Sequence, residues 1–179
     1  RVLFGSHAPL FYFEAAVCGG IPVIRVLREA LASDTVLALR GIVNGTSNFI
    51  LTRMAETGAS YSDALAEAQE LGYAEADPTD DVSGADAAAK MAILSSIAFH
   101  ARVRIEDVPY EGIDRLQAED MGHARSLGFV VKLLGVARLM AGSVSVRVYP
   151  ALVPRGHRLA AVGGPDNAVL LESAATGEI

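Results

Sequence analysis

Residues 129–149, FVVKLLGVARLMAGSVSVRVY, contain the pattern that decides the fold class. At 144–149 every second residue is valine, and the residues between are serine, arginine and tyrosine. Such alternation is typical of a strand with one buried face. An apolar run at 129–140 precedes it, and Gly142 lies in the short connection. The stretch therefore predicts a β-hairpin of 129–140 with 144–149.

Segments before and after this hairpin add helices and further strands. Strands are predicted at 11–17, 36–43, 158–162 and 168–173. Helices are predicted at 22–32, 46–58, 60–72, 83–99 and 117–126. Helices dominate the first half of the chain and strands the second. This segregation predicts an α+β fold, in which a mixed or antiparallel sheet carries helices packed on one face.

Residue types at the helix ends support these boundaries. Thr46 or Ser47 is predicted to cap the helix that ends near residue 58. The spacings Ser60–Asp63 and Ser83–Asp86 resemble capping boxes at the starts of the next two helices.

Composition limits the class of protein. The 179 residues are 51% hydrophobic and 20% charged, which suits one globular domain with its own core. The formal net charge of −6 argues against nucleic-acid partners and anionic membrane surfaces. No apolar stretch reaches the about 18 residues of a membrane span. The chain has one cysteine, Cys18, which allows no intrachain disulfide, so we expect a reducing, cytoplasmic setting.

The strongest chemical signal is the acidic segment 71–90, LGYAEADPTDDVSGADAAAK. Five carboxylates fall within twelve residues, and Lys90 follows the last of them, Asp86, by four positions. Residues four apart on a helix project from one face, so these two side chains are expected together. Clustered carboxylates need a cation, which could be Lys90, a metal or a substrate ammonium group. A lysine in this setting could also pass a proton to or from a reacting oxygen.

The acids and Lys90 of this segment could also have purely structural roles. Spacing alone favours such roles over a chemical one. Asp86 could be the acid of a capping box, and its pair with Lys90 could be a solvated surface pair worth about 0.3–0.5 kcal/mol. The acids at 75–81 could form an ordinary exposed loop. Their spacing does not match a calcium-binding helix–loop–helix. The alanine-rich faces around Asp86 indicate close packing instead, which would place the pair at the edge of a cleft.

Three segments resemble the homoserine dehydrogenase family in order and spacing. One is 72–78, GYAEADP, followed by Asp81, Gly84, Asp86, Ala88 and Lys90. The others are 13–22, FEAAVCGGIP, and 41–50, GIVNGTSNFI. The resemblance covers roughly residues 8–179. The three segments together are highly specific, whereas any one of them alone is a weaker signal.

The resemblance implies a reaction and a role for each site residue. Members of the family interconvert L-homoserine and L-aspartate 4-semialdehyde with NAD(H) or NADP(H), in threonine, methionine and isoleucine biosynthesis. Lys90 would be the proton donor and acceptor, and Asp86 would bind the substrate and orient Lys90. Glu75 would bind the α-ammonium group, and Asp81 would help to set the charge of the pocket. Tyr73, Gly45 and Thr46 would line the substrate site, and Gly72 and Glu75 would lie on the cofactor side.

The resemblance also implies a monovalent cation, sodium, near the glycine turn at 19–20. Its ligands would be the Glu14 side chain and the backbone carbonyls of Val17, Gly19 and Ile21. Carbonyl ligands leave the Cys18 thiol without a role. The residues alone favour another interpretation, in which Glu14 is an acid near a strand end that nearby N–H groups satisfy.

A dinucleotide-binding element is missing from the sequence. Such folds use a Gly-x-Gly-x-x-Gly turn between a strand and a helix, and neither 19–20 nor 163–164 fits it. The family's nucleotide-binding domain lies mostly before the first residue of this chain, which opens in an apolar run at 2–4. We therefore expect a fragment. Residues 1–179 would be the substrate-binding and dimerisation domain, inactive alone and with at most weak cofactor affinity.

The family dimerises through its sheet, so the resemblance implies a homodimer, with the apolar 129–153 hairpin as the candidate interface. Two other functions stay open on the residues alone. One is a non-catalytic acidic module that binds an amino acid or a metal. The other is a purely structural dimerisation domain.

Overall fold

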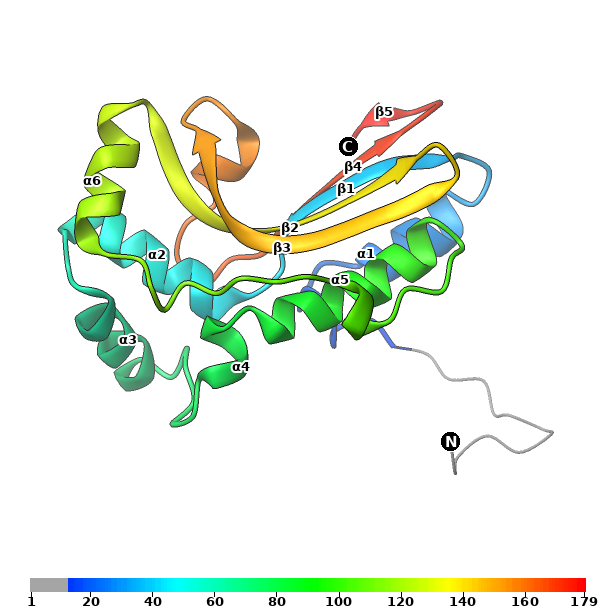
Figure 1. Ribbon diagram of the computed structural model, residues 1–179. Coiled ribbons are helices and arrows are strands. Elements are labelled where there is room, and N and C mark those ends of the chain that lie inside the picture. The colour runs from blue at the N-terminus through cyan, green and yellow to red at the C-terminus, as the bar shows by residue number, and fades with distance from the viewer. Residues whose placement is uncertain (1–12) are drawn as a thin grey trace.

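The computed structural model describes residues 13–179 and contains one five-stranded sheet (Figure 1). The strand order is β3-β2-β1-β4-β5, and all neighbours are antiparallel. The α+β class is confirmed, with an antiparallel sheet. The strands are β1 Val36–Ile42, β2 Phe129–Met140, β3 Ser143–Pro154, β4 Ala168–Ser173 and β5 Gly177–Glu178.

The predicted hairpin is confirmed as β2–β3. Its strands pair without a register shift from Phe129↔Pro154 to Met140↔Ser143. The connecting residues Ala141 and Gly142 have φ of 47° and 85°. Two successive positive φ values give the turn whose twist matches that of the flanking strands. The second strand continues past the predicted end at 149.

Helices cover one face of this sheet. Figure 1 places α1, α2, α4 and α5 beneath the strands, with α6 at the curled end of the hairpin. The helices are α1 Val23–Arg25, continued by the π-helix Val26–Ala30, then α2 Gly45–Thr57, α3 Tyr61–Glu70, α4 Thr79–Val82, α5 Ala85–Ala98 and α6 Ala118–Ser126. Two 3₁₀-helices span Ile105–Asp107 and Arg158–Ala161. The four-residue α4 was not predicted, and neither was β5.

Small residues let α5 approach the strands closely. Ala87 and Ala88 are almost fully buried, and Met91 lies against Gly135 of β2, where an added Cβ would be 2.4 Å from its side chain. Ala87, Ala88 and Met91 belong to the main hydrophobic core. A second, smaller apolar cluster is separate from it and includes Ile42, Leu134 and Leu159. The α5 helix, which carries Asp86 and Lys90, is therefore seated directly on β2 and β3.

Two predicted strands are wrong. Residues 13–17 form a turn closed by the Val17 N–H and the Glu14 carbonyl at 3.0 Å, while 11–12 lie outside the described residues. Residues 158–161 form a 3₁₀-helix, because the His157 Nδ1 accepts from the Leu159 N–H at 3.1 Å. That helix buries Leu159, which therefore reaches the core without joining the sheet.

Two predicted caps are wrong, and one is confirmed. Asn44 caps α2 by accepting from the Ser47 N–H at 2.8 Å, in place of Thr46 or Ser47. Gly84, with φ of 87°, precedes α5, where Ser83 was expected. Ser60 caps α3 as predicted, accepting from the N–H of the residue three positions on.

Asp34 ties the end of β4 to the start of β1. Its carboxylate accepts from the Ser173 hydroxyl at 2.7 Å and from the Ala175 and Thr176 N–H groups, each at 2.9 Å. These hydrogen bonds hold the pKa of Asp34 well below its ordinary value of 3.8, and the bond from the Ser173 hydroxyl has the largest effect. The ionised Asp34 carboxylate therefore stabilises the folded chain fully at pH values above this ordinary pKa. The contribution is lost as the pH falls below it.

A loop segment covers the middle of β3, the edge strand. Tyr110 forms a parallel bridge with Val148. The Glu111 N–H donates to the Val148 carbonyl at 2.9 Å, and the Val148 N–H donates to the Pro109 carbonyl at 3.0 Å. Elsewhere β3 carries Pro150 and Pro154, which have no N–H to offer at an edge.

None of the helices within 13–179 combines the length and the apolar character needed to cross a lipid bilayer.

Candidate functional site

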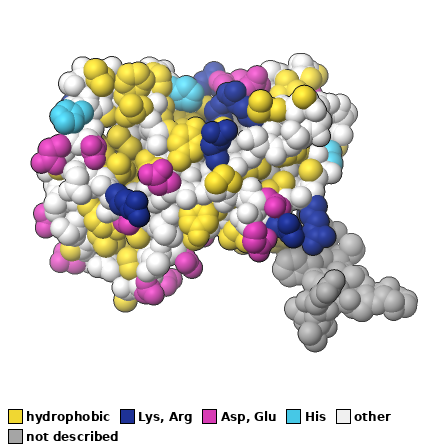
Figure 2. Space-filling view, viewed as in Figure 1, with side chains coloured by type: hydrophobic (Ala, Val, Ile, Leu, Met, Phe, Trp, Pro, Cys, Tyr) yellow, Lys and Arg dark blue, Asp and Glu magenta, His cyan; other side chains and the backbone are white. Residues whose placement is uncertain are grey.

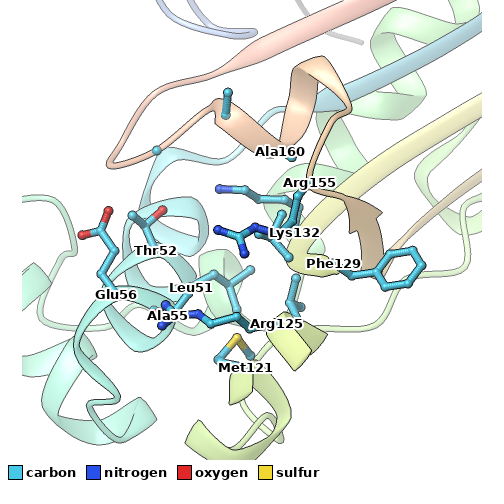
Figure 3. A pocket seen from close by; sticks show the side chains of 14 residues that line it. Leu51, Thr52, Ala55, Glu56, Met121, Arg125, Phe129, Lys132, Arg155 and Ala160 are labelled. Carbon is cyan, nitrogen blue, oxygen red and sulfur yellow. Dashed lines mark hydrogen bonds between the residues drawn. The ribbon is translucent and has the colours of Figure 1, made fainter. Parts of the chain in front are cut away.

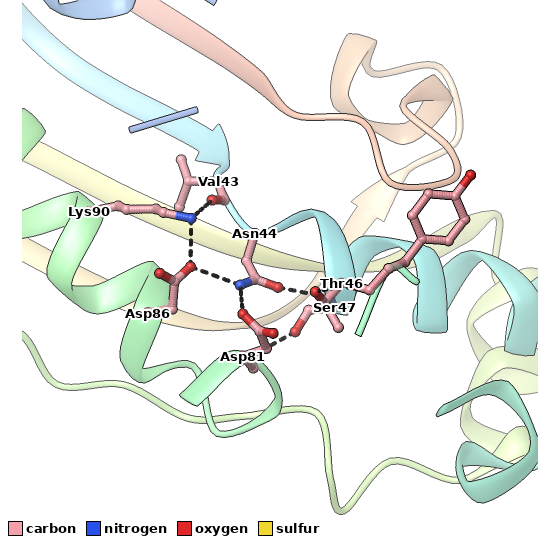
Figure 4. Close-up of polar contacts among 8 residues, drawn as sticks. Val43, Asn44, Thr46, Ser47, Asp81, Asp86 and Lys90 are labelled. Atoms are coloured by element: carbon pink, nitrogen blue, oxygen red, sulfur yellow. Dashed lines mark hydrogen bonds and ion pairs between the residues drawn. The ribbon is translucent and has the colours of Figure 1, made fainter. Parts of the chain in front are cut away.

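Two stretches distant in sequence meet where β1 ends (Figure 4). Val43 and Asn44 follow β1 and lead into α2, while α4 and the first turns of α5 face them. Figure 4 shows Lys90 and Asp86 reaching from α5 toward Val43 and Asn44. The acidic segment and the 41–50 segment, selected separately in the sequence, thus form one polar cluster.

The predicted pair of Lys90 and Asp86 lies in this cluster. The Lys90 Nζ is 2.6 Å from the Asp86 Oδ2 and donates to the Val43 carbonyl at 3.2 Å. The two side chains are only 21% and 30% exposed. They are thus shielded from bulk water, unlike the solvated pair that spacing alone would favour. Two acceptors take two of the three ammonium N–H groups, which leaves one available to a ligand.

Asn44 holds the two nearby carboxylates together, and the sequence analysis missed it. Its Nδ2 donates to the Asp81 Oδ1 at 2.6 Å and to the Asp86 Oδ2 at 2.8 Å. Its Oδ1 caps α2, and the residue is 4% exposed. The sequence analysis assigned Asn44 no role. An asparagine between a strand and a helix is a common N-cap, and that signal could have identified it.

The predicted substrate-lining residues lie around the start of α2. The Thr46 hydroxyl donates to the Tyr73 carbonyl at 2.7 Å, and the Tyr73 ring lies 4.8 Å from that of Phe49. Gly45 approaches the loop before β4 so closely that an added Cβ would lie 2.5 Å from the Pro165 carbonyl oxygen. These contacts hold the 72–76 segment and the 163–167 loop against one helix end.

The remaining acids of the segment have different surroundings. Figure 2 shows acidic side chains along the lower edge of the molecule, where α3 and the segment before α4 lie. Asp77 accepts from the Thr79 hydroxyl at 2.6 Å and the Thr79 N–H at 3.2 Å, and these bonds lower its pKa. Asp77 therefore serves the start of α4. Glu75 is exposed, and its side chain makes no hydrogen bond or ion pair within 13–179.

Gly72, placed on the cofactor side in the sequence analysis, adopts a left-handed φ of 78°, and nothing lies within 4 Å of where a Cβ would be. The backbone there is open to close approach by another molecule. Gly72, Tyr73 and Glu75 belong to the same turn, which follows α3.

The proposed cation ligands occupy the turn before α1. The Glu14 Oε1 and Oε2 accept from the Ile24 and Arg25 N–H groups at 2.7 and 3.0 Å. The Ile21 carbonyl accepts from the Val23 N–H at 2.8 Å. The carbonyls of Val17 and Gly19 accept no hydrogen bond from any residue of the described range. Glu14 thus stabilises the helix start, and two carbonyl oxygens of the turn retain free lone pairs.

Cys18 connects this turn with the Lys90–Asp86 pair. The residue is 2% exposed, has a positive φ of 63°, and burial raises the pKa of its thiol to about 11. The charges of Asp86 and Glu14 add to that increase, and the charge of Lys90 opposes it. The turn therefore lies close enough to the pair for their charges to act on one thiol. Among the described residues, His, Cys, Asp and Glu side chains form no group of three placed to hold a metal ion.

Comparisons with known proteins agree on one family. A family model described as homoserine dehydrogenase matches residues 22–179. The homoserine dehydrogenase of Mycobacterium tuberculosis is 58% identical over 97% of this chain and 40% of that protein, and that of Corynebacterium glutamicum is 51% identical over 94% and 39%. This chain therefore spans about two fifths of the length of these curated relatives.

Solved structures give the same result. A homoserine dehydrogenase from Thiobacillus denitrificans superposes with a TM-score of 0.91 at 50% identity, covering 93% of this chain and 39% of that one. The S. aureus homoserine dehydrogenase at pH 8.5 gives a TM-score of 0.80 at 40% identity, covering 82% and 37%. With the family model matching most of its length, the chain belongs to the homoserine dehydrogenase family.

Proposed function

We propose that this chain is the substrate-binding and dimerisation part of an oxidoreductase that interconverts L-homoserine and L-aspartate 4-semialdehyde with NAD(P)(H). The enzyme would serve threonine, methionine and isoleucine biosynthesis in the cytoplasm. The observation that carries the proposal is the shielded Lys90–Asp86 pair, joined through Asn44 to Asp81, in a chain of this family. An amine held in this way can exchange a proton with an oxygen that is being reduced or oxidised.

In this proposal Lys90 delivers its proton to the aldehyde oxygen of the semialdehyde and takes it back from the homoserine hydroxyl. The positive charge also stabilises the negative charge that develops on that oxygen. Asp86 fixes the amine at 2.6 Å and, through its second oxygen, is available to the substrate. Because Asn44 donates to both Asp86 and Asp81, the two acids keep their places without a metal between them.

The substrate's ammonium group accounts for the acid that lacks a partner. Glu75 is exposed and free of ion pairs within 13–179, so its carboxylate is available to a cation from solution. In the proposed complex it binds the α-ammonium group, with Tyr73, Gly45 and Thr46 lining the space between Glu75 and the Lys90 amine. Paired charges in a partly shielded site interact more strongly than in water.

The nicotinamide cofactor supplies the hydride when it is bound. The residues that would touch it in this chain are Gly72 and Glu75. The open space at Gly72 fits such a neighbour, because the backbone there has no side chain in the way. The pyrophosphate-binding turn is not present in this sequence, so this chain contributes only one side of the cofactor site.

In this proposal a sodium ion binds in the turn at 14–21. Sodium prefers hard oxygen ligands, and the carbonyls of Val17 and Gly19 have free lone pairs within the described chain. Each Glu14 oxygen accepts one backbone N–H and keeps further lone pairs for an ion. Bound there, the ion would fix the turn that carries Cys18 beside the Lys90–Asp86 pair.

This chain alone should show no turnover of L-homoserine with NAD⁺ or NADP⁺, because it has no pyrophosphate-binding element to hold the cofactor. The absorbance of the reduced nicotinamide provides the assay. The full-length enzyme that contains residues 1–179 is the positive control and should turn over. Steady turnover by the isolated chain would contradict the proposal that cofactor binding needs a part of the enzyme outside residues 1–179.

We also propose a homodimer, formed by the sheet face of the β2–β3 hairpin that the helices leave free. Val136, Met140 and Tyr149 line a shallow hollow on that face, and Met140 is 57% exposed. Sedimentation velocity should give a dimer for the unchanged chain and a monomer for Met140→Asp. The matched control is Leu127→Asp, which alters a 69% exposed leucine next to α6 and should leave the dimer intact. A monomeric unchanged chain would exclude this interface.

A further inference from the structure

A second polar centre lies in a cavity of about 190 Å³ between α2, α6, the start of β2 and the segment after β3 (Figure 3). Leu51, Met121 and Val131 supply its apolar wall. None of the residues assigned to the homoserine reaction lines it. The volume is several times the about 30 Å³ share of one water molecule in the liquid. It is below the about 300–1,000 Å³ of sites for drug-sized ligands, so a small metabolite fits best.

Lys132 of β2 brings a buried positive charge to this cavity. The residue is 5% exposed. Its Nζ donates to the Asn48 Oδ1 at 2.9 Å and to the Val162 carbonyl at 2.5 Å, and both acceptors are neutral. No carboxylate within 13–179 makes an ion pair with it. Two of the three ammonium N–H groups are thus used, and the charge is not neutralised.

The burial of the Lys132 ammonium group without a counter-charge affects its pKa. Burial lowers the pKa of Lys132 to about 8, and the charge of Glu56 acts in the opposite sense. A buried charge without a counter-charge destabilises a protein unless a partner offsets it. The side chain is therefore placed where an anion would stabilise it.

A second cation faces the same space. Figure 3 shows the side chains of Lys132 and Arg155 turned toward the cavity. Arg155 is exposed, and its guanidinium makes no hydrogen bond or ion pair with any described residue. Arg125 also lines the cavity, but its guanidinium donates to the Ala55 carbonyl near the end of α2. Glu56 is the acid among the lining residues, so the lining carries a net positive charge.

We propose that this cavity is a binding site for a small organic carboxylate, whose carboxylate group lies between Lys132 and Arg155 and whose apolar end contacts Leu51 and Met121. A bidentate guanidinium–carboxylate contact and the free N–H of the buried ammonium supply the charge-assisted hydrogen bonds. The apolar wall selects an organic anion over an inorganic one, because it removes the body of the ligand from water.

The probe is 3-methylbutanoate, and 3-methylbutanamide serves as its neutral counterpart of the same shape. Isothermal titration calorimetry on this chain should show saturable binding of one carboxylate per chain, with the amide at least about tenfold weaker. Inorganic phosphate should bind more weakly than the carboxylate. Equal binding of acid and amide, or phosphate binding without carboxylate binding, would overturn the proposal.

Two variants assign the binding to the named cations. Lys132→Met should abolish carboxylate binding, and Arg155→Ala should weaken it at least about fivefold. Arg155 is exposed, so its variant remains informative where Lys132→Met fails to fold. Arg102→Ala, which removes an exposed arginine outside the cavity, is the control and should bind normally. Unchanged affinity in Arg155→Ala would exclude the site.

Proton uptake provides a readout that a purely structural lysine would not give. The charged groups lining the cavity near Lys132 are Glu56, Arg125 and Arg155. A bound carboxylate raises the pKa of Lys132, so at pH 8 the complex should take up as much as about half a proton. Titrations in buffers of different ionisation enthalpy measure this number. Binding with no proton uptake at pH 8 would contradict contact with Lys132.

Discussion

Replacing Lys90 with alanine should lower kcat of the full-length enzyme by about 10²–10⁴-fold in both directions, the usual contribution of a positioned general acid–base group. The reason is that the variant has no amine to exchange a proton with the substrate oxygen or to stabilise its developing charge. Lys90 is partly shielded, and alanine removes its ion pair with Asp86 and its hydrogen bond to the Val43 carbonyl, so stability has to be measured beside activity. Steady-state kinetics measures the loss, and circular dichroism with thermal unfolding shows that the fold is retained.

Lys90→Arg separates proton transfer from charge balance. A guanidinium keeps the positive charge beside Asp86 but does not release a proton in the accessible pH range. The arginine variant should therefore be nearly as slow as the alanine variant. Arg104→Ala, at an exposed ion pair with Asp107, is the control and should keep its kcat. Near-normal turnover of Lys90→Ala would instead favour a non-catalytic binding module.

Asn44→Asp should lower kcat/KM of the full-length enzyme by about 10–100-fold at neutral pH. The variant keeps an oxygen that accepts from the Ser47 N–H, so α2 is still capped. It removes the two N–H groups that Asp81 and Asp86 accept, and it places a third carboxylate within hydrogen-bonding distance of both. The added carboxyl brings a further negative charge to the cluster, so the acidic limb of the pH–rate profile should move to higher pH.

A stability control distinguishes this effect from the loss of a helix cap. Ser60→Ala removes the N-cap of α3 and should cost about 1 kcal/mol of unfolding free energy with no change in the pH–rate profile. Asn44→Ala removes both the cap and the donors, so it should lower stability and activity together. An Asn44→Asp enzyme with an unaltered profile would show that Asn44 serves the helix alone.

The parts of the fold that could be predicted depend on local patterns. The valine alternation at 144–149 has a period that only a strand explains, and the hairpin formed as expected. Likewise Ser60 caps α3, because the side chain and the N–H that it accepts are three residues apart. The strand predicted at 158–162 was wrong for a physical reason. The apolar run at 159–162 is too short to show a period, and here the His157 ring accepts a backbone N–H and stabilises a turn.

Contacts between distant segments were beyond the reach of the sequence. The spacing of Asp86 and Lys90 predicted their pairing, and the structure has it at 2.6 Å. That spacing contained nothing about Asn44, which lies 37 and 42 residues from the two acids it joins. The charge of Lys132 was equally hidden, because a lysine inside an apolar strand gives no sign of which acceptors surround it. Residue roles in the reaction came from family resemblance, and they remain predictions for the variants above.

The covered edge of β3 has a consequence for handling the protein. A strand of twelve residues at the border of a sheet offers free N–H and C=O groups to any other strand, which is a route to aggregation. The bridge at Tyr110 occupies the middle of that border, and Pro150 and Pro154 interrupt its donors toward one end. Only short stretches are left for a foreign strand to pair with. This chain thus carries its own protection against fibrous self-association at high concentration.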